Sequence, residues 1–99
     1  MPKVLLQISY DIEPEKREQY LALIKEMKAH FRQTRKKNYE VFEQKGKKNS
    51  FVEEFTCASM EEYDALEDDL DEKSEDLVNR LEGIVKEGRA KYTTLMGIE

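Results

Sequence analysis

A chain of 99 residues fits one domain, so we expect a single domain over residues 1–99. Its net charge of −5 argues against nucleic acid as a partner, and its apolar runs are far shorter than the roughly 20 residues of a membrane-spanning helix. Cys57 is the only cysteine, which excludes an intramolecular disulfide, and with no leader-like apolar run it predicts a cytoplasmic protein.

A strand and a helix are the first predicted elements. The segment from Val4 to Tyr10 alternates strongly apolar residues with others at the two-residue period of a strand. Pro14 suits the first position of a helix, because its missing N–H would have no partner there. Apolar residues then recur at helical spacing, so we expect a helix from Pro14 to about Arg35, ended by Asn38.

A hairpin follows this helix. The segments from Tyr39 to Gln44 and from Phe51 to Cys57 are rich in β-forming residues. A short polar connection containing Gly46 separates them, which is typical of a hairpin between antiparallel strands.

The second helical region and a final strand complete the chain. Ser59 and Glu62 have the spacing of a capping box at a helix start. Helical spacing continues to Gly88, a natural stop, with a kink or short break near Asp71, which could cap a second segment. The alternation from Tyr92 to Ile98 predicts a terminal strand.

This order of elements predicts the fold class. A βαββαβ chain gives an α+β, ferredoxin-like domain whose four-stranded antiparallel sheet carries both helices on one face. Leu5 and Leu95 fall on the opposite face, where the middle strands also place apolar residues. Because such a face associates readily, we expect the protein to pair with itself as a homodimer through the sheet.

Nearly the whole chain resembles the dimeric α/β-barrel group, which includes the antibiotic-biosynthesis monooxygenase superfamily. The resemblance is carried by the opening strand VLLQISYDI, the proline-led helix, the hairpin and the stretch FVEEFTCASMEEYDAL. Proteins of this fold include cofactor-free monooxygenases, haem-degrading enzymes, isomerases and proteins without known activity, so the fold alone does not imply one function. Similar haem-degrading enzymes use an asparagine, a tryptophan and a histidine on the second helix. Here Gln7 stands near the asparagine position, and the other two residues have no counterpart.

The adjacent carboxylates Glu53 and Glu54 are the main candidates for chemistry. Alternation along a strand must send one toward the helices and the other to the opposite face. A carboxylate inside the sheet would lose hydration and gain the raised pKa that suits a general base. Glu54 matches an acidic position that similar proteins often carry before the second helix, so the resemblance favours Glu54 as the catalytic residue.

We therefore expect a ligand cavity between the sheet and the helices, lined by Gln7, Tyr10, Glu54 and Tyr63, that needs no metal and no cofactor. The only histidine, His30, fits a boundary position on the first helix without a catalytic role. Cys57 fits a buried structural thiol. The acidic run from Glu61 to Asp76 lacks the central glycine of a calcium loop and fits a solvated helix face.

Two classes of function remain open from the sequence. The protein either binds or turns over a small organic molecule without a metal, in a monooxygenase-like or isomerase-like reaction, or it is a non-catalytic association or regulatory module. An open pocket beside Glu54 favours the first class, and a filled core favours the second.

Overall fold

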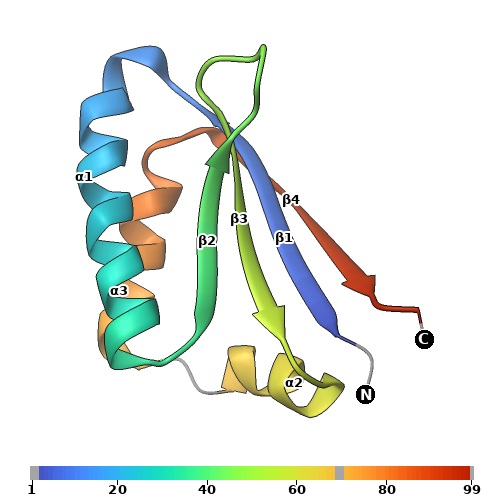
Figure 1. Ribbon diagram of the computed structural model, residues 1–99. Helices are drawn as coiled ribbons and strands as arrows, with labels where there is room; N and C mark the ends of the chain where they lie inside the picture. The colour runs from blue at the N-terminus through green and yellow to red at the C-terminus, as the bar shows by residue number, and fades with distance from the viewer. Residues whose placement is uncertain (1–2, 69–70, 99) are drawn as a thin grey trace.

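Residues 3–68 and 71–98, which the computed structural model describes, form a four-stranded antiparallel sheet with helices against it (Figure 1). The strand order in the sheet is β2-β3-β1-β4. The strands are β1 (Val4–Ile12), β2 (Asn38–Glu43), β3 (Ser50–Cys57) and β4 (Val85–Met96). The helical elements are η1 (Pro14–Lys16), α1 (Arg17–Lys28), η2 (Ala29–Thr34), α2 (Met60–Asp68) and α3 (Glu72–Glu82). The predicted ferredoxin-like α+β fold is confirmed.

The helices divide the sheet into a covered face and an open face. Figure 1 shows α1 and α3 side by side along one face, at the left of the sheet, while α2 lies at the end of the sheet where β3 finishes. Along β3, Phe51, Glu53 and Phe55 are buried toward the helices, and Val52 and Glu54 are only half-buried on the other side. The two-residue period of the strands therefore determines which side chains meet the helices.

The core between the helices and the covered face is rich in aromatic side chains. Tyr20, Leu23 and Met27 of α1 are buried there. The ring centroids of Phe31 and Phe55 are 5.4 Å apart in an edge-to-face arrangement, a favourable geometry for aromatic pairs. This packing fixes η2, which directly follows α1, against the centre of the sheet.

The predicted break in the second helical region is confirmed. Asp71 caps α3, since its Oδ1 accepts a hydrogen bond of 2.8 Å from the backbone N–H of Ser74. The predicted capping box is also present at the start of α2. The Ser59 hydroxyl accepts from the Glu62 N–H at 3.3 Å, and the Glu62 carboxylate accepts from the Ala58 N–H at 2.9 Å. Residues 69 and 70 lie outside the described residues.

The first helix does not keep its regular form to its predicted end. A π-helical turn, η2, replaces its last part, and the Arg35 N–H donates to the His30 carbonyl at 2.9 Å. The Lys37 N–H then donates to the Phe31 carbonyl at 2.7 Å. Lys36 between them has a φ of 57°, in the left-handed region, which reverses the chain toward β2.

The expected helix end at Gly88 is wrong. The helix α3 ends at Glu82, and Val85 already pairs with Ile12 as the first residue of β4. Apolar residues three and four positions after Leu81 fit a helix and a strand start equally, so their spacing did not distinguish the two.

The early start of β4 requires an irregularity where it pairs with β1. The partner of Tyr10 is Ala90, so four residues of β4, 86–89, stand opposite Asp11 alone. Glu87 and Gly88 both have positive φ within this bulge, at 56° and 65°. Gly88 therefore serves a strand bulge rather than a helix stop.

The cap of α3 should contribute measurably to the stability of the fold. Asp71→Ala should lower the thermal midpoint by about 4–8 °C, because the backbone N–H of Ser74 at the start of α3 loses its acceptor. Asp71→Asn keeps an acceptor oxygen while removing the charge, so it should recover most of the loss. Thermal unfolding followed by circular dichroism measures both. Equal losses in the two variants would show that the charge of Asp71, and not its cap, stabilises the helix.

Candidate functional site

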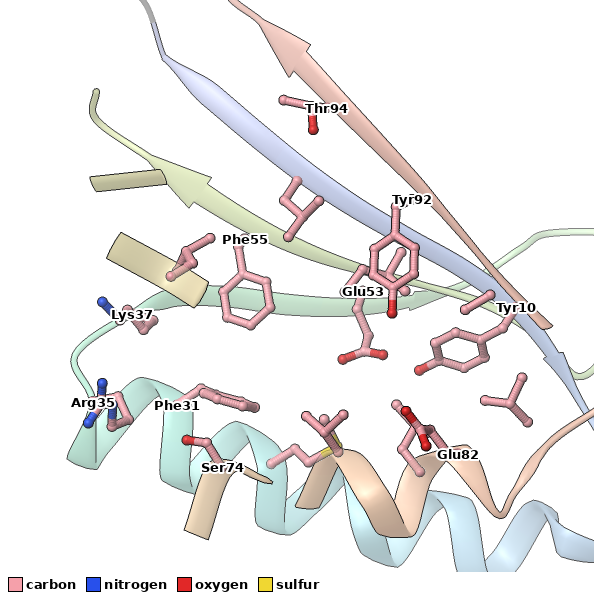
Figure 2. A pocket seen from close by; sticks show the side chains of 18 of the residues that line it. Tyr10, Phe31, Arg35, Lys37, Glu53, Phe55, Ser74, Glu82, Tyr92 and Thr94 are labelled. Atoms are coloured by element: carbon pink, nitrogen blue, oxygen red, sulfur yellow. The ribbon is translucent and has the colours of Figure 1, made fainter. Parts of the chain in front are cut away.

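A cavity of about 470 Å³ lies between the covered face of the sheet and the helices (Figure 2). Its volume falls in the range of about 300–1,000 Å³ that is usual for small-molecule sites. Apolar side chains make up most of its wall, among them Leu6 and Ile8 of β1 and Leu81 of α3. The rim at β4 is exposed, since Tyr92 lines the cavity with 67% of its surface accessible. The cavity can therefore admit a molecule from solvent.

Glu53 is the buried carboxylate of this cavity. It is 2% exposed, and Figure 2 shows its side chain pointing from β3 toward the helices. Its Oε1 accepts a hydrogen bond of 2.6 Å from the Tyr39 hydroxyl, whereas Oε2 is buried without a partner among the described residues. Burial raises the pKa of Glu53, and the tyrosine hydroxyls that face it oppose the rise only in part. Glu53 therefore has a carboxyl group that is oriented by Tyr39 and keeps one oxygen without a hydrogen-bond partner among the described residues.

Three tyrosine hydroxyls surround this carboxyl group. Tyr10 and Tyr20 share a hydrogen bond of 2.8 Å between their hydroxyl oxygens, and Tyr39 contacts Glu53 directly. Burial, followed by the charge of Glu53, raises the pKa of both Tyr10 and Tyr39. The tyrosines therefore stay protonated and can act as hydrogen-bond donors, not as bases.

The structure separates the four predicted site residues into two pairs. Tyr10 and Tyr63 do line the cavity, and the Tyr63 hydroxyl lies 2.7 Å from the Thr94 hydroxyl at its rim. Gln7 and Glu54 lie on the open face, where they are neighbours in register and the Gln7 amide donates to Glu54 at 3.4 Å.

The expectation that Gln7 and Glu54 line the cavity is therefore wrong. Glu53 and Glu54 are consecutive, so the burial of one toward the helices turns the other away. The apolar residues in phase with Glu53, at 51, 55 and 57, carried this information in the sequence. The resemblance to an acidic position before the second helix favoured Glu54 instead.

His30 belongs to a buried polar cluster that joins two helical elements. Its Nε2 lies 3.0 Å from the Ser74 hydroxyl and 3.2 Å from Asp71 Oδ1. A serine–histidine–aspartate triad would place serine and aspartate on different ring nitrogens, so this arrangement does not activate Ser74. The hydroxyl and backbone N–H of Ser74 hold the pKa of Asp71 below its usual range, and the cluster ties η2 to the start of α3.

The cysteine, the metal-ligating residue types and the helix lengths bear on other kinds of site. Cys57 is buried, and burial raises the pKa of its thiol, which makes it a poor nucleophile. Within residues 3–68 and 71–98, no group of three or more histidine, cysteine, aspartate or glutamate side chains could hold a metal ion. In the same ranges, no helix is both long and apolar enough to span a membrane.

Arg35 and Lys37 are cavity residues that the sequence reasoning missed. The expected helix ends at about Arg35, with Lys37 just beyond it, but the chain reversal after η2 brings both residues to the cavity wall. The sequence holds no local signal for this placement, because it depends on a π-helical turn and one left-handed residue.

Solved structures resemble this chain, although no protein-family model and no curated protein matches it. A NIPSNAP family protein from Agrobacterium tumefaciens has a TM-score of 0.75 at 16% identity, covering 94% of this chain and 90% of that one. An antibiotic biosynthesis monooxygenase has a TM-score of 0.69 at 22% identity, covering 100% and 98%. A variant of SnoaB, a cofactor-independent oxygenase from Streptomyces nogalater, has a TM-score of 0.75 at 9% identity, covering 98% and 94%. The predicted resemblance to antibiotic-biosynthesis monooxygenase-like proteins is confirmed as a likeness of fold.

Proposed function

We propose that this protein binds a small organic molecule in the cavity and moves a proton on that molecule through Glu53. The observation that carries the proposal is the vacant Oε2 of Glu53, buried in a mostly apolar cavity. A general base needs a free lone pair and a pKa near the working pH, and burial raises the pKa of Glu53 in that direction. The Tyr39 hydroxyl holds the carboxyl group in place while Oε2 faces the ligand.

The proposed reaction begins with removal of a proton from a carbon beside a carbonyl group or from a hydroxyl group. The Tyr10 hydroxyl, which remains protonated, supplies a donor for negative charge that develops on a ligand oxygen. In an isomerase-like reaction, Glu53 returns the proton to a second atom of the same molecule. In a monooxygenase-like reaction, the ligand anion reacts with dioxygen. The oxygenase named among the similar folds supports this second form, and neither form needs a metal or a cofactor from the protein.

Anthrone is a suitable probe, because its methylene protons are acidic and its reaction with dioxygen gives anthraquinone and water. In D₂O under argon, the wild-type protein should accelerate exchange of these protons, as followed by proton NMR. Glu53→Gln should lower the protein-dependent exchange by about 100-fold or more, which is the usual contribution of a general base. Dioxygen uptake with the same probe distinguishes the monooxygenase-like form.

Glu54→Gln is the matched control, since it makes the same chemical change at the neighbouring position on the open face. It should leave the exchange rate unaltered. A loss of exchange with Glu54→Gln and none with Glu53→Gln would reverse the assignment. No protein-dependent exchange, together with no binding of an apolar probe, would leave the non-catalytic association module as the better account.

We also propose that a second copy of the chain covers the open face of the sheet. Leu5 and Leu95 are neighbours in register on this face, and Leu95 is 43% exposed. Phe42 of β2 lies on the same face, two strands from Leu5 and three from Leu95, and is 50% exposed. A self-complementary pairing about a two-fold axis would remove these apolar side chains from water. The single, buried Cys57 supports our further proposal of a reducing, cytoplasmic location.

A further inference from the structure

The proposed proton transfer leaves one end of the cavity without a role. Figure 2 shows Arg35 and Lys37 together at the end beside Phe31, while Tyr10 and Glu82 lie toward the opposite end. Glu53 lies between these two ends. The cavity is therefore polarised, with two cationic side chains at one end and carboxylates in the rest of its wall.

The backbone holds the cationic end in place. The Lys37 N–H is bound to the Phe31 carbonyl, and the next residue, Asn38, begins β2. Lys36 takes up the chain reversal, which brings Arg35 and Lys37 to the cavity wall while the side chain of Lys36 stays exposed. Arg35 and Lys37, on either side of the left-handed residue Lys36, therefore both line this end of the cavity.

The two cations differ in how their charge is balanced. The Arg35 guanidinium lies 3.5 Å from Asp71 Oδ2, so part of its charge is already offset. Lys37 is only half-exposed, and in the described part of the chain no carboxylate lies within ion-pair distance of its Nζ. A partly buried ammonium group gains most from an opposite charge that shares its environment. A ligand in the cavity would supply that charge.

We propose that the ligand is an organic anion. Its acidic group, a carboxylate or a group of similar charge, binds Lys37 with help from Arg35. Its apolar body lies along Phe31 and Phe55, and its reacting carbon or hydroxyl group reaches Glu53. This inference rests on the proposed function, because it takes the cavity as the ligand site. It narrows the substrate class to small, mostly apolar acids, which should bind more tightly than neutral ring systems of the same size that also fit the cavity.

Two fluorescent probes test the anion separately from the cavity. N-phenyl-1-naphthylamine is neutral, and 1-anilinonaphthalene-8-sulfonate has the same ring system with one added sulfonate. In fluorescence titrations, Lys37→Gln should weaken binding of the sulfonate probe about tenfold, the scale of one charge-assisted hydrogen bond. Binding of the neutral probe should change less than twofold. Lys37→Arg keeps the charge and should retain the sulfonate affinity.

Lys36→Gln is the matched control, because it removes the same charge from the adjacent, exposed residue outside the cavity wall. It should leave the affinity for both probes unaltered. Equal weakening by Lys36→Gln and Lys37→Gln would mean that only overall charge attracts the probe, and this overturns the inference. Binding of the neutral probe with no effect of Lys37→Gln on the sulfonate probe also overturns it, while the cavity remains a ligand site. Failure of both probes to bind would overturn the ligand cavity as well.

Discussion

The wild-type protein should lose stability as the pH rises above 4.5, the ordinary pKa of a glutamate side chain, and Glu53→Gln should abolish this loss. Burial raises the pKa of Glu53 in the folded protein, but not in the unfolded chain. Between these two pKa values, the folded state keeps a proton that the unfolded state releases. The free energy of unfolding therefore falls as the pH increases through that window. Each unit of pKa difference corresponds to about 1.4 kcal/mol.

Urea unfolding of the wild type and of Glu53→Gln, from about pH 4 to about pH 9, measures this effect. The change with pH is the decisive quantity, because the unpaired amide hydrogens of the variant reduce stability at every pH. Glu54→Gln, on the open face, should keep the decline of the wild type. A decline of equal size in Glu53→Gln would contradict the assignment of Glu53 as the buried, titrating carboxyl group.

Leu95→Asp should convert a homodimer into a monomer. The leucine is 43% exposed in a single chain, so the substitution leaves the fold of that chain intact. In the proposed dimer the same position is covered, and an unpaired buried charge costs about 3–5 kcal/mol, which weakens association more than a hundredfold. Sedimentation at micromolar concentration should return twice the chain mass of 11.7 kDa for the wild type and the chain mass for the variant.

Leu21→Asp provides the control for this experiment. It introduces the same charge at a leucine that is 48% exposed on α1, on the opposite side of the molecule from the open face. It should leave the dimer unaltered. A monomeric wild type would rule out the self-association proposal, and dissociation by Leu21→Asp as well would rule out the open face as its specific location.

The sequence predicted the features of the fold that depend on local periodicity. The alternation in β1 and β3, the helical stripe of α1 and the cap at Asp71 are each determined by residues close together in the chain. These signals sufficed for the order of elements and hence for the fold class. They failed at β4, because Val85 satisfies helical spacing from Leu81 and also pairs with Ile12, and only the distant strand decides between these states.

The candidate site was less predictable for a similar reason. The alternation of β3 required one of the two adjacent glutamates to face the helices, and its apolar neighbours indicated Glu53. The tyrosines near Glu53 come from other strands and a helix, so local alternation could not predict them. The placement of Lys37 depends on a π-helical turn, which is a rare element, and on the left-handed residue Lys36. Long-range contacts therefore determine which polar side chains meet in the cavity, whereas local patterns determine which strands and helices enclose it.

The adjacent glutamates make the cavity sensitive to a single-residue shift in strand pairing. If β3 moved by one residue against β1, Glu54 would enter the cavity, and Glu53 would take its place beside the open face. The cavity would still contain a carboxylate, but Phe51 and Phe55 would be carried out with Glu53, and Val52 and Thr56 would be carried in. The number of carboxylates in the cavity would stay the same after such a shift, but the aromatic side chains that β3 contributes to its wall would be lost. Accurate pairing of β1 with β3 is thus as much a requirement for the site as the identity of its carboxylate.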